Sequence, residues 1–128
     1  MEKVLIDSDI LIDFLRGFDL RYKNFFKRIY RKEITGLISL ITIVELYSGA
    51  DTQDKRKLEF LEKSLLPLEP IGINLETAKL AGDWRLRYKL SIPDSLIAVT
   101  SFIEKAKLFT FNQKHFQKIK EIKFYEIK

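Results

Sequence analysis

A short apolar segment, followed at once by an acid and a helix, constrains this chain more than any other feature. Residues 4–6 are consecutive apolar residues, a pattern typical of a strand that is buried on both faces. Asp7 follows, and Ser8 and Asp9 suit the start of a helix that Gly17 is placed to end. Asp7 therefore lies either at the ligand-binding edge of a parallel sheet or simply at a helix cap, and both interpretations fit this segment.

The same succession of strand and helix repeats along the chain. Further strands are predicted at residues 36–40, 68–73, 107–111 and 121–125. Pro70 places the strand at 68–73 on a sheet edge. Helices are predicted at residues 19–32, 42–48 and 51–65, and others begin at Asn74 and Ser91. This alternation indicates a three-layer α/β/α sandwich around a central, mostly parallel sheet, in one domain spanning residues 1–128.

The composition limits the chemistry that the chain can perform. Its 128 residues include no cysteine, which excludes disulfides and thiolate catalysis, and one histidine, which excludes a metal site of several imidazoles. A metal would be held by oxygen, which favours Mg²⁺ or Mn²⁺. The formal net charge of +5 permits a polyanionic partner without proving one. Because no apolar run reaches membrane-span length and no signal pattern opens the chain, we expect a cytoplasmic protein.

Two further acids repeat the placement of Asp7. Glu45 lies in the first turn of the helix predicted to begin at Thr42, where a capping box would account for it. Asp94 follows Pro93 in the first turn of a later helix, where the helix dipole favours an anion. The apolar stripe that includes Asp94 directs this acid inward, and no basic residue along the helix is spaced to pair with it. A bound cation would supply the missing partner.

These placements indicate a metal-dependent nuclease. Asp7, Glu45 and Asp94, together with the turn that contains Asn112 and His115, follow strands or open helices and could converge on one sheet edge. Three acids in a small basic protein suit cleavage of a phosphodiester by a magnesium-activated water. For His115, a role at the surface or in contact with phosphate is favoured over a role as a ligand of Mg²⁺. The basic residues of 21–32 are interpreted as a solvated helix face, in preference to a phosphate-binding surface.

Four segments carry these residues, in order, along nearly the whole chain. They read DSDILID with LRG (7–13 and 15–17), TIVELYSGA (42–50), IPDSLIA (92–98) and LFTFN with HF (108–112 and 115–116). These segments resemble the motifs of the PIN-domain family, and of VapC-type toxins in particular. The resemblance implies an Mg²⁺- or Mn²⁺-dependent endoribonuclease toxin that is commonly a homodimer and that a cognate VapB-like antitoxin holds inactive.

The resemblance also implies roles for individual residues. It implies that the metal-binding acids are Asp7, Glu45 and Asp94, and that Asn112 joins them in the catalytic site. Asp9 stands where the family often has asparagine, which implies a role next to the metal ligands or in positioning the substrate. The family's last acid usually falls in the turn that here holds Asn112 and His115. We therefore expect one well-occupied metal site and a weak second site.

Two other interpretations fit part of the pattern. A response-regulator receiver domain shares the length, the fold class and an acidic pair after the first strand. It requires a phosphoacceptor aspartate where this chain has Asn74, however, and it leaves Glu45 and Asp94 unexplained. A PIN domain that binds RNA without cleaving it would keep the fold, but the retention of three acids argues against it.

Overall fold

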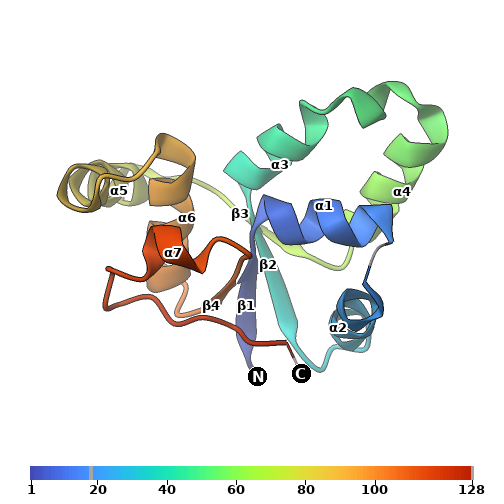
Figure 1. Ribbon diagram of the computed structural model, residues 1–128, viewed down its shortest axis with the longest axis horizontal. Helices are drawn as coiled ribbons and strands as arrows, with labels where there is room; N and C mark the ends of the chain where they lie inside the picture. The colour runs from blue at the N-terminus through green and yellow to red at the C-terminus, as the bar shows by residue number, and fades with distance from the viewer. Residues whose placement is uncertain (18, 128) are drawn as a thin grey trace.

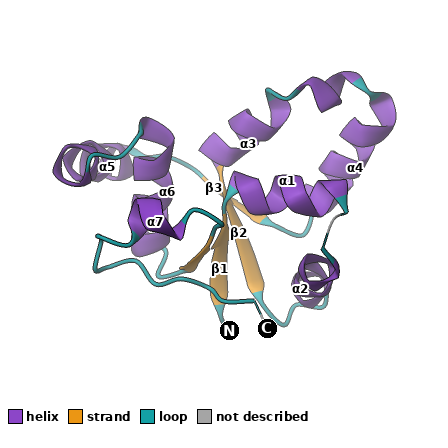
Figure 2. Ribbon diagram, in the orientation of Figure 1, coloured by secondary structure: helices purple, strands orange, loops and turns teal. Residues whose placement is uncertain are grey.

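A four-stranded sheet lies at the centre of the computed structural model, which describes residues 1–17 and 19–127 (Figures 1 and 2). The strands are β1 (Lys3–Ile6), β2 (Thr35–Ser39), β3 (Glu69–Ile71) and β4 (Lys107–Phe109). All three pairings are parallel and the order is β3-β2-β1-β4, so β1 lies inside the sheet and β3, which contains Pro70, lies at an edge. The predicted α/β architecture with a mostly parallel sheet is confirmed.

Helices cover both faces of the sheet, as Figure 2 shows. They are α1 (Ser8–Arg16), α2 (Leu20–Tyr30), α3 (Leu40–Tyr47), α4 (Lys55–Leu65), α5 (Leu75–Tyr88), α6 (Ile92–Ile103) and α7 (Gln113–Phe116), with the 3₁₀ turn η1 (Ala50–Gln53). Alternate residues of β1 enter two separate cores: Val4 and Ile6 pack with α1, α2 and α4, whereas Leu5 packs with α5 and α6. Among the described residues, no helix combines the length and the apolar character needed to cross a bilayer.

Local capping chemistry decides where the helices begin. Asn74 and Ser91 cap α5 and α6 as predicted. The predicted capping box at Thr42 is wrong, because α3 begins earlier, at a cap formed by Ser39, whose Oγ accepts from the backbone N–H two residues on at 3.2 Å. The predicted helix at 51–65 is interrupted by Asp54, whose carboxylate accepts from two backbone N–H groups of α4 and thereby separates η1 from α4.

The C-terminal part of the chain departs most from the predicted elements. Strand β4 ends at Phe109 rather than at residue 111, because the chain then turns toward the acids of α1. The predicted turn at 112–116 contains the short helix α7. The predicted strand at 121–125 is reduced to one parallel bridge, between Leu108 and Phe124. The main chain nevertheless runs beside β4 there, since Leu108 N–H donates to Lys123 O at 2.8 Å and Tyr125 N–H donates to Leu108 O at 2.9 Å.

Candidate active site

Asp7 lies at the carboxyl end of the central strand and also caps α1, so both interpretations of this residue hold. Its Oδ1 accepts from the Ser8 N–H at 2.8 Å. Its Oδ2 accepts from the hydroxyl of Thr110, just beyond the neighbouring strand β4, at 2.9 Å. The side chain is only 8% exposed, and this burial, more than any other cause, raises the pKa of the Asp7 carboxyl.

Glu45 and Asp94 share the electrostatic environment of Asp7. Glu45 projects from α3, and Asp94 lies in the first turn of α6. The pKa of Glu45 is raised first by partial burial and then by the negative charges of Asp7 and Asp94, while a hydrogen bond with the Ser8 hydroxyl opposes this rise. The fold therefore brings the three acids to one edge of the sheet, although three different helices carry them.

Asp94 has a protein partner that the spacing along its own helix does not reveal. His115, on α7, places Nδ1 at 3.1 Å from Asp94 Oδ2. A bound cation at Asp94 stays a prediction, and the structure adds a protein partner that comes from another element. The imidazole itself is largely exposed, so its second nitrogen remains at the surface beside the acids.

Asp9 ties the start of α1 to the segment that follows β4. Its Oδ2 accepts from the Phe111 N–H at 3.1 Å and from the Asn112 side-chain amide at 3.3 Å, and it lies 3.3 Å from the Thr110 hydroxyl. Burial and the nearby charge of Asp7 raise the pKa of Asp9 from 3.8 to about 6. Its Oδ1 is buried and, within the described part of the chain, has no hydrogen-bond partner. The amide of Asn112 thus contacts Asp9 directly rather than Asp7, Glu45 or Asp94.

The chemistry of these side chains fits a divalent cation that prefers oxygen ligands. Burial first, and then the negative charge of neighbouring acids, raises the pKa values of Asp7, Asp9 and Glu45, and a cation would relieve the repulsion. Within residues 1–17 and 19–127, no three acid or histidine side chains are placed as a ready-made group of metal ligands. The acids surround the edge and would have to draw together around an ion.

The chain also matches known proteins. A family model described as the PIN domain matches residues 4–122. This chain belongs to the PIN-domain family. It is 30% identical over 125 residues to Ribonuclease VapC10 of Mycobacterium tuberculosis, covering 94% of this chain and 90% of the relative. It is also 30% identical over 130 residues to Ribonuclease VapC1 of Methanocaldococcus jannaschii, covering 97% and 88%.

A solved structure supports the same assignment. A chain from a toxin–antitoxin complex of Klebsiella pneumoniae aligns with a TM-score of 0.75 at 28% identity, covering 97% of this chain and 99% of that chain. Together with the VapC relatives, this match confirms the resemblance seen in the sequence motifs: the chain is a PIN domain of the VapC ribonuclease type.

A groove runs along α1 of this PIN domain, and Glu45 is the one of the three candidate metal-binding acids that lines it. It has a volume of about 790 Å³ and lies between α1, α3, η1 and α4. Apolar side chains line much of it, including Ile12, Leu46, Leu58 and Leu61, and Glu45 lies on its wall. The groove is therefore an apolar surface that is continuous with one of the candidate metal-binding acids.

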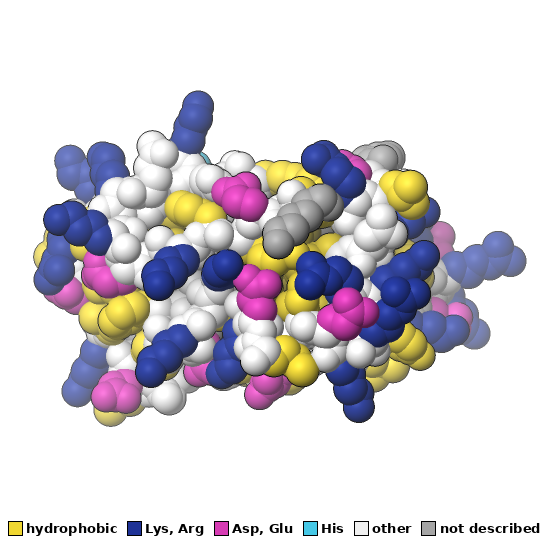
Figure 3. All heavy atoms as spheres, turned by 90° about the horizontal axis from the view of Figure 1, so that it is seen from below, with side chains coloured by type: hydrophobic (Ala, Val, Ile, Leu, Met, Phe, Trp, Pro, Cys, Tyr) yellow, Lys and Arg dark blue, Asp and Glu magenta, His cyan; other side chains and the backbone are white. Residues whose placement is uncertain are grey.

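Positive charge is not confined to the edge that carries the acids. Figure 3 views the molecule from the side of the chain termini, away from that edge, and shows Lys and Arg spread over this face among scattered acids. On α2, Arg21 pairs with Asp19 at 2.9 Å and Arg28 lies 3.6 Å from Glu33. These pairs favour the solvated-face interpretation of the basic residues on α2.

Sequence reasoning missed Thr110, whose hydroxyl donates to Asp7 at 2.9 Å and lies 3.3 Å from Asp9. The only local signal is its position directly after an apolar strand. A threonine there is common, and nothing in its spacing reveals that its partners lie about a hundred residues away. The structure therefore adds a residue that fixes two acids at once.

An Asp9→Asn variant is expected to be more stable than the wild type in metal-free buffer at neutral pH. Since the folded-state pKa of about 6 exceeds the ordinary 3.8, the folded protein binds the proton more tightly than the unfolded chain, and ionisation of Asp9 above pH 6 costs stability. Allowing for the partial exposure of Asp9, we expect a gain of roughly 1–2 kcal/mol. Urea unfolding with EDTA measures it.

The gain should shrink as the pH falls from about 6 toward about 4, because the wild-type carboxyl then becomes neutral in the folded protein. Asp83→Asn is the matched control, since Asp83 is exposed and pairs with Arg87 on α5, away from the site. An equal gain at both ends of this pH range would show that charge at Asp9 is not the cause.

Proposed function

We propose that this PIN domain is the toxin of a VapBC-like pair and cleaves RNA phosphodiester bonds with Mg²⁺ or Mn²⁺. The observation that carries the proposal is the gathering of Asp7, Glu45 and Asp94 at one sheet edge in a chain of the VapC ribonuclease type. When bound, the ion supplies a Lewis acid and an activated water. The single histidine and the absence of cysteine leave the carboxylates as the main candidate ligands.

Each residue of the site has a proposed part in this reaction. Asp7 and Asp94 would hold the ion, and Glu45 would support it directly or through a bound water. Asp7 is pre-oriented by Ser8 and Thr110, and the imidazole of His115 orients Asp94. Asn112 acts through Asp9, to which its amide donates, and so supports the turn around the site rather than holding the ion.

RNA is proposed to bind through its phosphates. The net charge of +5 supports an electrostatic contribution to binding. Arg16 and Lys114 are the first candidates for phosphate contacts, because they lie on helices that also carry residues of the site. Arg16 ends α1, and Lys114 lies in α7 beside His115. The basic residues of α2 are a second group, of which Arg21 and Arg28 are already engaged with acids.

An antitoxin is proposed to occupy the groove along α1. Its apolar lining suits the apolar face of a helix, and Glu45 on its wall suits an arginine from the same partner. The toxin–antitoxin complex among the solved relatives supports an antitoxin as a partner, whereas the place of binding is argued from the groove itself. We also propose a homodimer, for which exposed apolar residues of α3, namely Leu40, Val44 and Tyr47, offer a surface. A monomeric mass by light scattering over the micromolar range would contradict the dimer.

Divalent-metal-dependent cleavage of RNA tests the proposed function. The purified chain, incubated with total bacterial RNA, is expected to cut it with Mg²⁺ or Mn²⁺ and not with EDTA. RNA binding should weaken by about 10-fold or more between 50 and 200 mM KCl, because phosphate contacts release counterions. Cleavage that persists in EDTA would contradict the metal mechanism. RNA binding without cleavage under any of these conditions would instead identify a non-catalytic RNA-binding PIN domain.

A further inference from the structure

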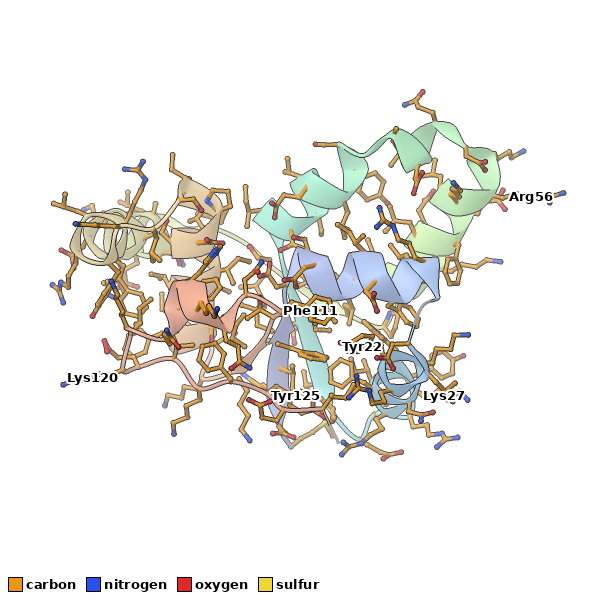
Figure 4. All side chains as sticks on the ribbon, in the orientation of Figure 1. Tyr22, Lys27, Arg56, Phe111, Lys120 and Tyr125 are labelled. Atoms are coloured by element: carbon orange, nitrogen blue, oxygen red, sulfur yellow. The ribbon has the colours of Figure 1, made fainter. Side chains whose placement is uncertain are left out.

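Phe111 is a large apolar side chain that the fold holds in place without burying it. It is 49% exposed and belongs to neither hydrophobic core formed by the described residues. Its position is nevertheless well defined, because its N–H donates to Asp9 at 3.1 Å and its ring meets Tyr22 edge to face, with centroids 5.5 Å apart and planes at 73°. Figure 4 shows the two rings turned toward each other between α1 and α2.

The neighbours of Phe111 in the chain are fixed to the acids. Thr110 donates to Asp7 at 2.9 Å, and the Asn112 N–H donates to the Thr110 hydroxyl at 3.1 Å. The ring of Phe111 is thus attached to a backbone that cannot shift without breaking contacts to Asp7 and Asp9. Tyr22 is itself buried, so it supports the ring from a rigid core.

A rigid, half-exposed aromatic ring beside a phosphodiester-cleaving site has an evident use. Single-stranded RNA is bound by stacking its bases on aromatic side chains. An edge-to-face contact with Tyr22 occupies at most one face of the Phe111 ring, and the residue is half-exposed, so the ring is accessible to a base. The acids nearby repel phosphate, but a base is neutral. We propose that Phe111 stacks on a base of the RNA next to the cleaved phosphate and so sets the position of the strand. This inference rests on the proposed ribonuclease function and adds a substrate-positioning residue to it.

Stacking requires a flat ring, which distinguishes it from simple apolar contact. Phe111→Leu keeps an apolar side chain and removes the ring, whereas Phe111→Tyr keeps the ring. Phe102→Leu is the matched control, because Phe102 is similarly exposed, at 42%, and lies eight residues beyond Asp94, about 12 Å along α6. All variants are made in an Asp94→Asn background to prevent cleavage, and their melting temperatures are compared to establish folding.

The probe is a set of single-stranded RNAs of about 12 nucleotides, a length within the range that such surfaces bind. Each carries one 2-aminopurine or one abasic position, moved along the strand. In the protein with Phe111 and in the Phe111→Tyr variant, RNA binding should quench the fluorescence of 2-aminopurine at one position of the RNA strand. Phe111→Leu should lose that quenching and bind about 10-fold more weakly, while Phe102→Leu should not change.

A double-mutant cycle separates stacking from general weakening. Removing the base at the quenched position should cost the Phe111 protein about 10-fold in affinity and the Phe111→Leu protein almost nothing. Unchanged affinity and quenching in Phe111→Leu, with RNA still bound by that protein and cleaved by the wild type, would overturn this inference alone. Failure of the wild type and every variant to bind or cleave RNA would overturn the proposed function, and this inference with it.

Discussion

An Asp94→Asn variant is expected to cleave RNA at least about 100-fold more slowly than the wild type while remaining folded. Asparagine has nearly the shape of aspartate, and its side-chain oxygen can still accept from His115, which lies 3.1 Å away in the wild type. The helix cap is also preserved, since Ser91, not Asp94, supplies it. Only the negative charge is lost, and with it the anionic ligand that we propose for the ion.

The readouts are the cleavage rate under saturating RNA and calorimetric titration with Mn²⁺ in the absence of RNA. We expect one tight Mn²⁺ site in the wild type and its loss in the variant. Asp83→Asn removes an exposed acid of α5 and serves as the control that should retain both properties. Wild-type cleavage by a folded Asp94→Asn protein would exclude Asp94 from the site, and two equally tight sites in the wild type would reveal a ligand beyond Asp7, Glu45 and Asp94.

A complex of the chain with its cognate antitoxin is expected to show almost no RNA cleavage. A helix in the groove along α1 would cover Ile12 and Leu58 and bring its own side chains to Glu45. An arginine there would neutralise Glu45 and compete with the metal for the carboxylates. The measurement compares cleavage by the co-purified complex with cleavage by the free toxin at equal concentration and equal Mg²⁺.

One substitution in the groove sharpens this comparison. Ile12→Glu places a charge in the apolar groove, so it should weaken the complex and restore cleavage in the mixture. Leu86→Glu makes the same change at an exposed position on α5, outside the groove, and should leave the complex inactive. If the complex is as active as the free toxin, the antitoxin does not act at these acids.

Much of the architecture could be predicted because its signals are local. The apolar segment before Asp7, the Asn74 cap and the Ser91–Pro93 helix start each lie within a few residues of what they determine. The parallel sheet follows from the alternation of such segments. Where two local signals compete, as Ser39 and Thr42 do for the start of α3, spacing alone selected the wrong one.

The contacts that organise the candidate site could not be predicted from such local signals. His115 reaches Asp94 from a different element, and Asp9 accepts from residues that follow β4, more than a hundred positions later. Such pairs depend on the placement of β4 beside β1 in the sheet. The hydrophobic pattern of neither strand indicates which strand will be its neighbour. Motif resemblance identified the acids, but only the fold shows that Asn112 contacts Asp9.

The position of β1 between β2 and β4 makes the candidate site depend on β4, a strand that lies far from β1 in the sequence. Asp7 lies 103 residues before its Thr110 partner, and the groups that contact Asp9 also come from residues 110–112. Until β4 pairs with β1, the first strand has β2 as its neighbour, and Asp7 and Asp9 lack the hydrogen bonds that residues 110–112 provide. Pairing of β4 with β1 and formation of the site are therefore one event, because the free energy that orders residues 110–112 also orders Asp7 and Asp9.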